Sequence, residues 1–376
     1  MSVSDAAIAA AITTIPGLGP ARIRLLLGHH EPGEALAALR GRASLHPMVR
    51  RAIPADSLAD IRRAAEHVRP SVIAERCAEH RIDVLLDGDP DYPVALAGDP
   101  ERPVVLFVRG DRSVLDARRV AVVGTRNATR AGLATADDLG RQLSEAGVAV
   151  VSGLARGIDG AAHSGVRSVH TVGSGAAVGV VGCGLDRPYP RQHTALWNWV
   201  GEHGLLVSEW APGTEPTGWR FPMRNRIIAG LAEVLVVVES RERGGSLITA
   251  GLAIDRGVEV MVVPGSPRCR ASSGTNQLLA AGAAPVTSVD DVLVMLGLDH
   301  RRDTGAPYDP RPRPDAEGRR VLEACSVEPM NLDGLMTATG LPLHTVALAA
   351  ARLERSGWLV EAGGWFEPLG SRLGGR

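Results

Sequence analysis

Small and polar residues follow the apolar run VAVV (120–123), at the point where a helix-like stretch begins. They are Gly124, Thr125, Arg126 and Thr129. A glycine between a strand and a helix leaves backbone N–H groups and the positive end of the helix dipole free to meet an anion. The hydroxyls can cap the helix or bind phosphate, and the guanidinium adds a bidentate charge. The segment therefore predicts a phosphate-binding turn, with a plain glycine-rich turn and a solvated arginine as the alternative.

Four later loops combine the same backbone amides, hydroxyls and arginines. They are VVSGLARGIDGAAH (150–163), VVGCGLDRPYPRQH (180–193), FPMRNRIIAG (221–230) and ESRERGGSLITA (239–250). Their candidate phosphate-binding residues are Ser152, Gly153, Ala155, Gly157, Arg191, Arg224, Asn225, Arg226, Gly245, Ser246 and Thr249. We expect residues 224–226 at a helix start, where one of the two arginines could equally serve in a structural salt bridge.

Asp159 and His163 are four residues apart and share one face of a predicted helix. Two residues are too few for a metal or acid–base site, so we favour Asp159 as a helix cap and His163 as a packed side chain. The dinucleotide fingerprint would need glycine in place of Arg126, and no P-loop, GxSxG, HExxH or CxxC motif occurs. We therefore expect no catalytic residues, no metal and no cofactor.

These loops follow seven short valine-rich runs, which are separated by stretches long enough for helices. The runs must therefore position the loops. The runs are 104–108, 120–123, 148–152, 177–181, 205–208, 233–239 and 258–263. Continuous apolar strands that alternate with helices, such as 130–147, indicate a parallel sheet buried on both faces. We predict an α/β fold with a Rossmann-like, doubly wound, mostly parallel sheet. The five loops should meet beyond the carboxyl ends of its strands.

Segments rich in proline, glycine and charged residues divide the chain into three predicted domains and a linker. The expected parts are a helical domain (1–75), the Rossmann-like domain (76–299), a proline-rich linker (300–318) and a winged helix (319–376). In the first, IPGLGPARIRLLL (15–27) matches a helix-hairpin-helix (SAM-like) pattern, which either offers amides to DNA phosphates or only packs helices. In the last, the expected third helix (341–358) is rich in alanine and leucine, so duplex binding and protein contact remain equally open.

Composition restricts where an anion-binding surface can lie. The net charge is −1, so any basic surface must be local. All 41 basic residues are arginine, which a GC-rich genome would explain, and every cationic contact is therefore a guanidinium. No apolar run approaches the roughly 18 residues that span a bilayer, and the N-terminus has no basic segment typical of a signal peptide. We expect a soluble, cytoplasmic protein.

Several motifs in fixed order resemble the DNA-processing protein A (DprA/Smf) family. Between about residues 87 and 284 they are DYPVAL, VVGTR, VVSGLARGIDGAAH, GCGLDRPYPRQHTAL, FPMRNRIIAGL, GGSLITA and SGTNQLLAAGA. The resemblance implies a protein that binds single-stranded DNA, dimerises through its Rossmann-like core and loads the RecA recombinase in natural transformation. It also implies no catalytic activity.

The resemblance assigns roles to individual positions. Arg126 is similar to the arginine that grips the DNA backbone, and Arg191 stands where many members have lysine. Residues 224–226 match the RNR helix start of the family, whereas Gly244 stands where members often have serine, which removes one hydroxyl. Aromatic residues make up only 3% of the chain, so a broad stacking platform is not expected. Just before the RNR sequence, Trp219 and Phe221 are the stacking candidates, with core packing as the alternative.

Two other functions are consistent with parts of the sequence. Nucleoside-monophosphate phosphoribohydrolases share a Rossmann-like core, but their PGGxGT loop and following glutamate are not matched by RGGSLITA (243–250). A transcriptional regulator would require residues 319–376 alone to bind duplex DNA in a sequence-specific way.

Overall fold

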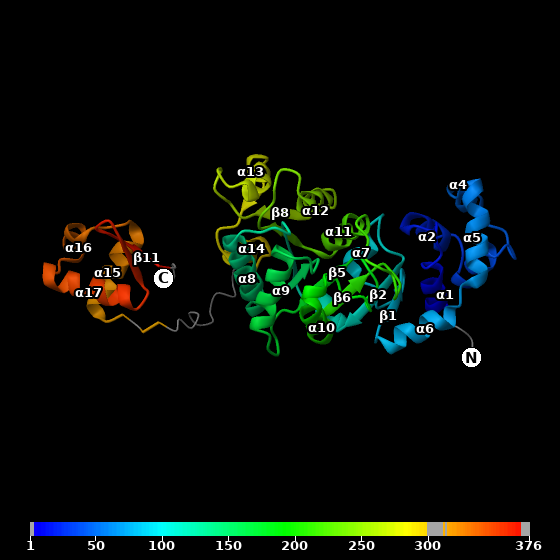
Figure 1. Ribbon diagram of the computed structural model, residues 1–376, viewed down its shortest axis with the longest axis horizontal. Helices are drawn as coiled ribbons and strands as arrows, with labels where there is room; N and C mark the ends of the chain where they lie inside the picture. Colours follow the sequence, from blue (N-terminus) through cyan, green and yellow to red (C-terminus); the bar gives the residue numbers. More distant parts are fainter. Residues whose placement is uncertain (1–3, 299–310, 313, 370–376) are drawn as a thin grey trace. The chain divides into compact units, whose positions relative to one another are not determined.

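The computed structural model describes residues 4–298, 311–312 and 314–369 (Figure 1). The chain forms two compact units, divided between residues 301 and 302, and each is described by itself. Most of the predicted linker (300–310 and 313) lies outside the described residues.

A nine-stranded, mostly parallel sheet forms the centre of the first unit. Its order is β1-β2-β6-β5-β4-β3-β7-β8-β9, and only β1–β2 and β2–β6 pair antiparallel. The strands are β1 (Asp83–Leu86), β2 (Val105–Gly110), β3 (Arg119–Val123), β4 (Ala149–Ser152), β5 (Ala177–Val181), β6 (Leu205–Ser208), β7 (Val234–Val237), β8 (Glu259–Val262) and β9 (Ala284–Pro285). The predicted mixed α/β fold with a mostly parallel sheet is confirmed. The two edge strands β1 and β9 were not predicted from the sequence.

Strand order reverses direction between β3 and β7. From β3 the chain runs outward through β4, β5 and β6, and it then returns to add β7 and β8 on the other side of β3. Val120 of β3 is accordingly paired with Val150 of β4 on one side and with Val234 of β7 on the other. In a doubly wound sheet this switch point leaves a crevice beyond the carboxyl ends of the strands.

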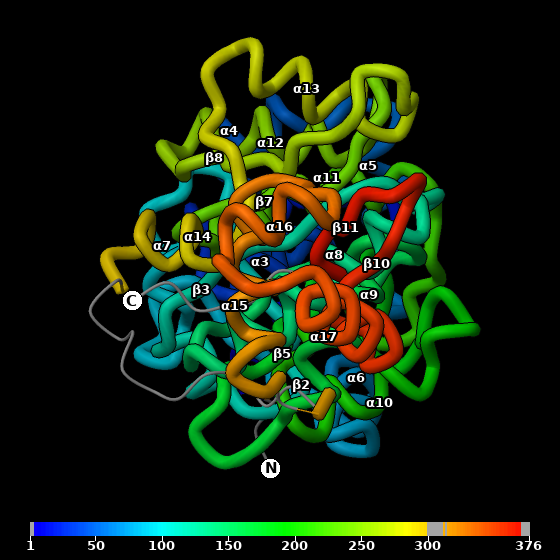
Figure 2. The backbone as a smooth tube through the Cα atoms, turned by 90° about the vertical axis from the view of Figure 1, so that its left-hand side faces the viewer, coloured from blue at the N-terminus to red at the C-terminus, as the bar shows by residue number. Residues whose placement is uncertain are grey.

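Helices cover both faces of the sheet, because alternate strand residues point to opposite sides. Val120 and Val122 pack with helices α8 (Arg130–Glu145), α9 (Ile158–Ser168), α10 (Thr194–His203) and α14 (Val289–Met295). Ala121 and Val123 pack with α7 (Val94–Ala97), α11 (Arg220–Leu231) and α12 (Gly245–Ile254). Figures 1 and 2 show α9 and α10 on one side of the sheet and α11, α12 and α13 (Ser273–Ala280) on the other.

Six N-terminal helices of the described chain lie beside the sheet, and the first five of them share a separate apolar cluster. They are α1 (Asp5–Ile12), α2 (Pro20–Leu27), α3 (Pro32–Leu39), α4 (Pro47–Ala52), α5 (Ala55–His67) and α6 (Pro70–Glu79). In the turn between α1 and α2, Gly17 has φ +85°, a left-handed conformation that favours glycine. Gly19 is the N-cap of α2, and Pro20 begins the helix, where its missing N–H is not needed. Helix α1 also contributes Ala9 and Ala10 to the core under the sheet.

The second unit has its own small core. Helices α15 (Ala316–Val327), α16 (Leu332–Thr339) and α17 (Leu343–Arg355) precede the hairpin β10–β11 (Leu359–Ala362 and Trp365–Pro368). Helix α16 ends at Gly340, a left-handed residue. Across the described residues, no single helix is long and apolar enough to cross a membrane, whereas α16 and α17 pass that test as a pair bent by 109°.

Candidate nucleic-acid interface

A cleft of about 660 Å³, here called the core cleft, opens at the switch point of the sheet. Its walls are the turn after β3, the first half of α11 and the loop that leads into α12. Nine of the predicted site residues line it: Gly124, Thr125, Arg126, Ala155, Arg224, Asn225, Gly245, Ser246 and Thr249. The structure thus brings together predicted site residues from four of the five loops, and Tyr189 of the remaining loop (180–193) also lines the cleft.

Arg126 is exposed at the mouth of the core cleft. Its guanidinium carbon lies 4.9 Å from the centre of the Phe221 ring, and Phe221 stacks on Tyr189 with ring centres 5.3 Å apart. A guanidinium over an aromatic face keeps its N–H groups free at the edge while the ring holds its plane. Arg126 is therefore oriented toward the cleft and forms no ion pair among the described residues, although its charge opposes the rise that burial causes in the pKa of Asp159.

Arg224 lies at the floor of the cleft and is only 3% exposed. It donates a hydrogen bond to the carbonyl oxygen of Val180, at the end of β5. Burial lowers the pKa of Arg224 to about 10, and nearby Asp159 opposes that shift. The Asp159 carboxylate in turn accepts a hydrogen bond from the Gly153 N–H at 3.1 Å. Arg224 and Asp159 therefore fix the ends of β4 and β5 under the cleft.

The start of α12 faces the core cleft with its backbone rather than its hydroxyls. The Ser246 hydroxyl donates to the Ser240 hydroxyl at 2.8 Å, and the Thr249 hydroxyl reaches the Gly245 carbonyl at 3.4 Å. A Cβ on Gly245 would meet no atom within 4 Å, so there is open space above the first turn. This end of α12 suits an anion through its dipole and N–H groups.

Four other predicted site residues face the protein interior instead. The Ser152 hydroxyl donates to the Val122 carbonyl at 2.6 Å, and the Thr129 hydroxyl donates to buried Glu239 at 2.5 Å. Gly157 has φ +81° and caps α9, where a Cβ would overlap the Thr125 carbonyl. A Cβ on Gly153 would likewise overlap Arg224. These residues shape the turns of the cleft but do not line it.

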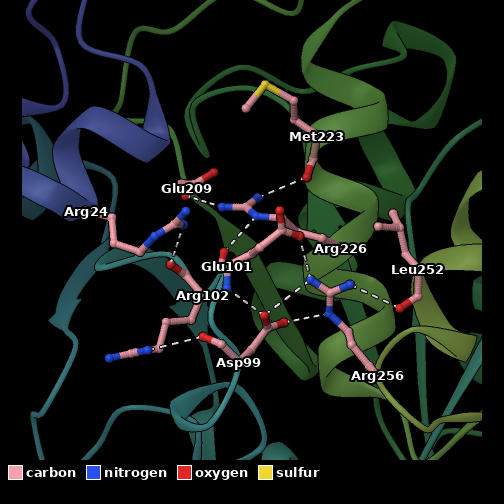
Figure 3. A network of polar contacts seen from close by, with 9 residues as sticks. All are labelled: Arg24, Asp99, Glu101, Arg102, Glu209, Met223, Arg226, Leu252 and Arg256. Atoms are coloured by element: carbon pink, nitrogen blue, oxygen red, sulfur yellow. Dashed lines mark hydrogen bonds and ion pairs between the residues drawn. The ribbon is translucent and has the colours of Figure 1, made fainter. Parts of the chain in front are cut away.

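Arg226 lies on the far side of α11 from the core cleft. It forms an ion pair with Glu209 at 2.5 Å and donates to the carbonyl of Glu101 at 2.9 Å (Figure 3). This is the structural salt bridge that the sequence analysis left open for one of the two arginines. The helix also begins at Arg220 and not near residue 224, because Pro222 is tolerated in a first turn.

Arg191 is exposed just beyond the core cleft. It begins a short 3-10 helix after the cis bond between Tyr189 and Pro190. Arg191 itself does not line the cleft, but Tyr189, two residues earlier, does. A long guanidinium side chain at this position can reach a ligand that leaves the cleft.

Arg241 and Arg243 are functional candidates that the sequence analysis did not single out. Both line the core cleft, both are exposed, and neither has a carboxylate partner in the part of the chain that the structure describes. Their signal was in the sequence, since they stand directly before the Gly244–Gly245 pair that leads into α12. The glycines predict the turn, whereas nothing in the local sequence shows that the neighbouring arginines face the cleft.

Asp159 and His163 do not form a catalytic pair. His163 is fully buried, its Nε2 contacts the Val150 carbonyl at 3.2 Å, and burial lowers its pKa to about 4. Asp159 does not cap α9, because Gly157 occupies the N-cap and the carboxylate instead binds the preceding loop. Within the described residues there is also no group of three His, Cys, Asp or Glu side chains that could hold a metal ion.

The fold and the cleft define a doubly wound α/β protein with an arginine-lined cleft at the switch point of its sheet. The chain belongs to the DNA recombination-mediator protein A family (DprA/Smf), whose model matches residues 83–297. It is 38% identical over 215 residues to the DNA processing protein DprA of Bacillus subtilis. The matched region covers 57% of this chain and 71% of that protein.

Two solved structures of DprA proteins resemble this one. The X-ray structure of DprA from Streptococcus pneumoniae has a TM-score of 0.65 and 30% identity, covering 78% of this chain and 98% of that one. A Helicobacter pylori DprA structure, described for its single-stranded DNA binding mode, has a TM-score of 0.52 and 27% identity. It covers 58% of this chain and 97% of the other.

Proposed function

We propose that this protein binds single-stranded DNA in the core cleft, with little dependence on base sequence. The observation that carries the proposal is a group of exposed arginines without carboxylate partners among the described residues. Arg126, Arg241 and Arg243 line the cleft, and Arg191 lies just beyond it. Guanidiniums grouped around helix N-termini suit a run of phosphodiesters better than a single small anion.

The proposed contacts fall into two kinds. Exposed arginines neutralise phosphates, while the amides near Gly124 and Gly245 and the Asn225 side chain fix the path of the backbone. Phe221 and Tyr189 offer one stacked aromatic surface beside Arg126, which suits an unpaired base. Ser152, Gly153, Gly157 and Thr129 act by shaping these turns.

Family membership supports a wider role in DNA processing. We infer a protein without catalytic activity that acts in the cytoplasm as a homodimer. In this role it protects incoming DNA and helps load RecA in natural transformation or homologous recombination. The Helicobacter pylori relative, described as binding single-stranded DNA, supports the choice of ligand.

The flanking parts receive structural proposals of their own. We infer that residues 4–75 form a helix-hairpin-helix (SAM-like) domain, because Gly17 and Gly19 shape the turn before α2. The second unit has the helix order and terminal hairpin of a winged helix, which supports that assignment.

A competition titration tests the proposed ligand. Labelled single-stranded oligonucleotide would be displaced by unlabelled single strand or by duplex of the same length, at salt from about 50 to 200 mM. Four neutralised phosphates predict a log–log salt slope of about −3, or a roughly 50-fold loss of affinity over this range. Arg126→Glu should weaken binding by about tenfold or more. Equal binding by this variant, or stronger binding of duplex, would contradict the proposal.

A further inference from the structure

A second cleft, here called the hairpin cleft, lies between the α1–α2 turn and the central sheet. Its volume is about 670 Å³, within the range of small-ligand sites. Residues 13–20 form one wall, and residues 209–210 and 212–214 with Trp219 and Arg220 form the other. The proposed single-stranded DNA site does not include this cleft.

Two residues that line the hairpin cleft, Glu209 and Arg220, each have a buried polar atom without a hydrogen-bond partner among the residues described. Glu209 is 8% exposed, and its Oε1 accepts from Arg226 at 2.5 Å, but its Oε2 has no hydrogen bond (Figure 3). The Nε of Arg220 is also buried without a partner. Since buried polar groups in folded proteins are nearly always hydrogen-bonded, the unpaired carboxylate oxygen and guanidinium N–H of these two lining residues are suited to a bound ligand. That ligand must both donate and accept hydrogen bonds.

The cleft also offers an anion site and an aromatic surface. Helix α2 begins here at Gly19, whose N–H and that of Ala21 have no backbone acceptor, and no side chain caps the helix. Arg76, which forms an ion pair with Asp186 at 3.4 Å, also lines the cleft, and the Arg220 guanidinium carbon lies 4.9 Å from the centre of the half-exposed Trp219 ring. A nucleotide could make all three contacts. Its phosphate would lie at the helix start, a base N–H would donate to Glu209, and the face of the base would lie on Trp219.

The two clefts share one short segment of chain. Gly218 and Phe221 line the core cleft, whereas Trp219 and Arg220, between them in sequence, line the hairpin cleft. The two clefts are therefore lined by neighbouring residues at the start of α11. We propose that the hairpin cleft holds a further nucleotide of the same DNA strand, with its phosphate on the start of α2 and its base against Trp219 and Glu209. This inference rests on the proposed function of the core cleft.

A charge placed at the start of α2 tests the phosphate contact. Gly19 is exposed with an extended backbone (φ −80°), and a Cβ there would meet nothing within 4 Å, so Gly19→Asp fits and also provides a favourable N-cap. Gly33→Asp is the matched control, because Gly33 is an exposed glycine at the start of α3, has equal room and lines neither cleft. Both full-length variants would be titrated with oligonucleotides from about 4 to 16 nucleotides long.

Length dependence distinguishes the two clefts. Gly19→Asp should leave the shortest bound oligonucleotide unaffected and weaken the longer ones by roughly fivefold, with a salt slope reduced by about 0.7. If Gly19→Asp and Gly33→Asp bind alike at every length, the hairpin cleft takes no phosphate and the inference fails, while the core cleft stands. If the unaltered protein binds no single-stranded DNA at all, both the proposed function and this inference fail.

A missing base tests the Glu209 contact independently. An abasic residue moved along a long oligonucleotide should weaken binding by roughly fivefold at the position that occupies the hairpin cleft. Glu209→Gln keeps an oxygen for Arg226 but turns the free acceptor into a donor, so this variant should lose most of that position-dependent effect. Thermal unfolding confirms that the variant is folded. A uniform response along the oligonucleotide, or an unchanged profile in Glu209→Gln, overturns the base contact.

Discussion

Arginine plays two distinct roles at the core cleft, and the difference is burial. Arg224 and Arg226 are 3% and 8% exposed and hold the protein together through carbonyl and carboxylate partners. Arg126, Arg241 and Arg243 are exposed and have no carboxylate partner in the described ranges. Removing a buried arginine leaves its partners unsatisfied, whereas reversing an exposed one changes the charge of the cleft without disturbing the fold.

Arg243→Glu tests this distinction at a position that the sequence analysis did not identify. The variant should unfold at the same temperature as the unaltered protein but bind single-stranded DNA about tenfold more weakly, because it replaces attraction to a phosphate with repulsion. Arg167→Glu is the control, since Arg167 is exposed in the last turn of α9 and lines no part of the cleft. Equal losses in the two variants would show that net charge, and not the cleft, governs binding.

His163 makes stability depend on pH. The folded protein protonates this buried imidazole only below a pKa of about 4, whereas the unfolded chain does so below about 6.5. Unfolding therefore takes up a proton between these values, so the free energy of unfolding falls by about 3 kcal/mol as the pH drops from 6.5 to 4. Urea titrations across this range should show a flatter profile for His163→Gln. Parallel profiles would mean that His163 does not titrate differently in the two states.

At the scale of elements, two glycines set how closely α8 and α9 approach each other. A Cβ on Gly140 of α8 would overlap the Ala162 carbonyl, and a Cβ on Gly165 of α9 would overlap the Asp137 carbonyl. The two backbones are therefore in contact, with no space for a side chain between them. This contact supports the helices that follow β3 and β4, whose first turns lie beside the core cleft.

Gly140→Ala should destabilise the protein by about 1–3 kcal/mol, because the two helices would have to separate. Gly251→Ala is the matched control in α12, where a Cβ meets nothing within 4 Å. That variant should instead gain up to about 1 kcal/mol, because alanine favours a helix interior. Chemical denaturation of both proteins measures the difference. Similar free energies of unfolding in the two variants would mean that α8 and α9 can separate without cost.

Strand positions could be predicted from sequence because a parallel sheet buried on both faces leaves long apolar runs. The runs at β3, β5 and β7 are of this kind, whereas the two-residue β9 leaves no pattern. The turns of the core cleft were equally visible, since glycines and hydroxyls stand next to strand ends. The direction of a polar side chain could not be predicted from the sequence. Thr129 contacts Glu239, 110 residues away, and Arg226 contacts Glu209. Such pairings exist only once the fold brings distant strands together.

At the scale of the whole molecule, the proposed DNA contacts all belong to one of the two units. Both clefts lie within residues 13–249, and the second unit has its own core around Val346 and Trp358. The family model likewise matches only residues 83–297. We therefore expect the affinity for single-stranded DNA to be independent of the second unit.

Truncation after residue 298 measures this contribution directly. If the first unit carries all the phosphate contacts, the fragment and the full chain should share a salt slope of about −3, and their affinities at any one salt concentration should agree within about threefold. A slope shallower by about 0.7 for each lost contact would instead count the phosphates that the second unit neutralises. Because the slope counts charges, it separates a lost contact from a general weakening of the fold, which would lower affinity equally at every salt concentration.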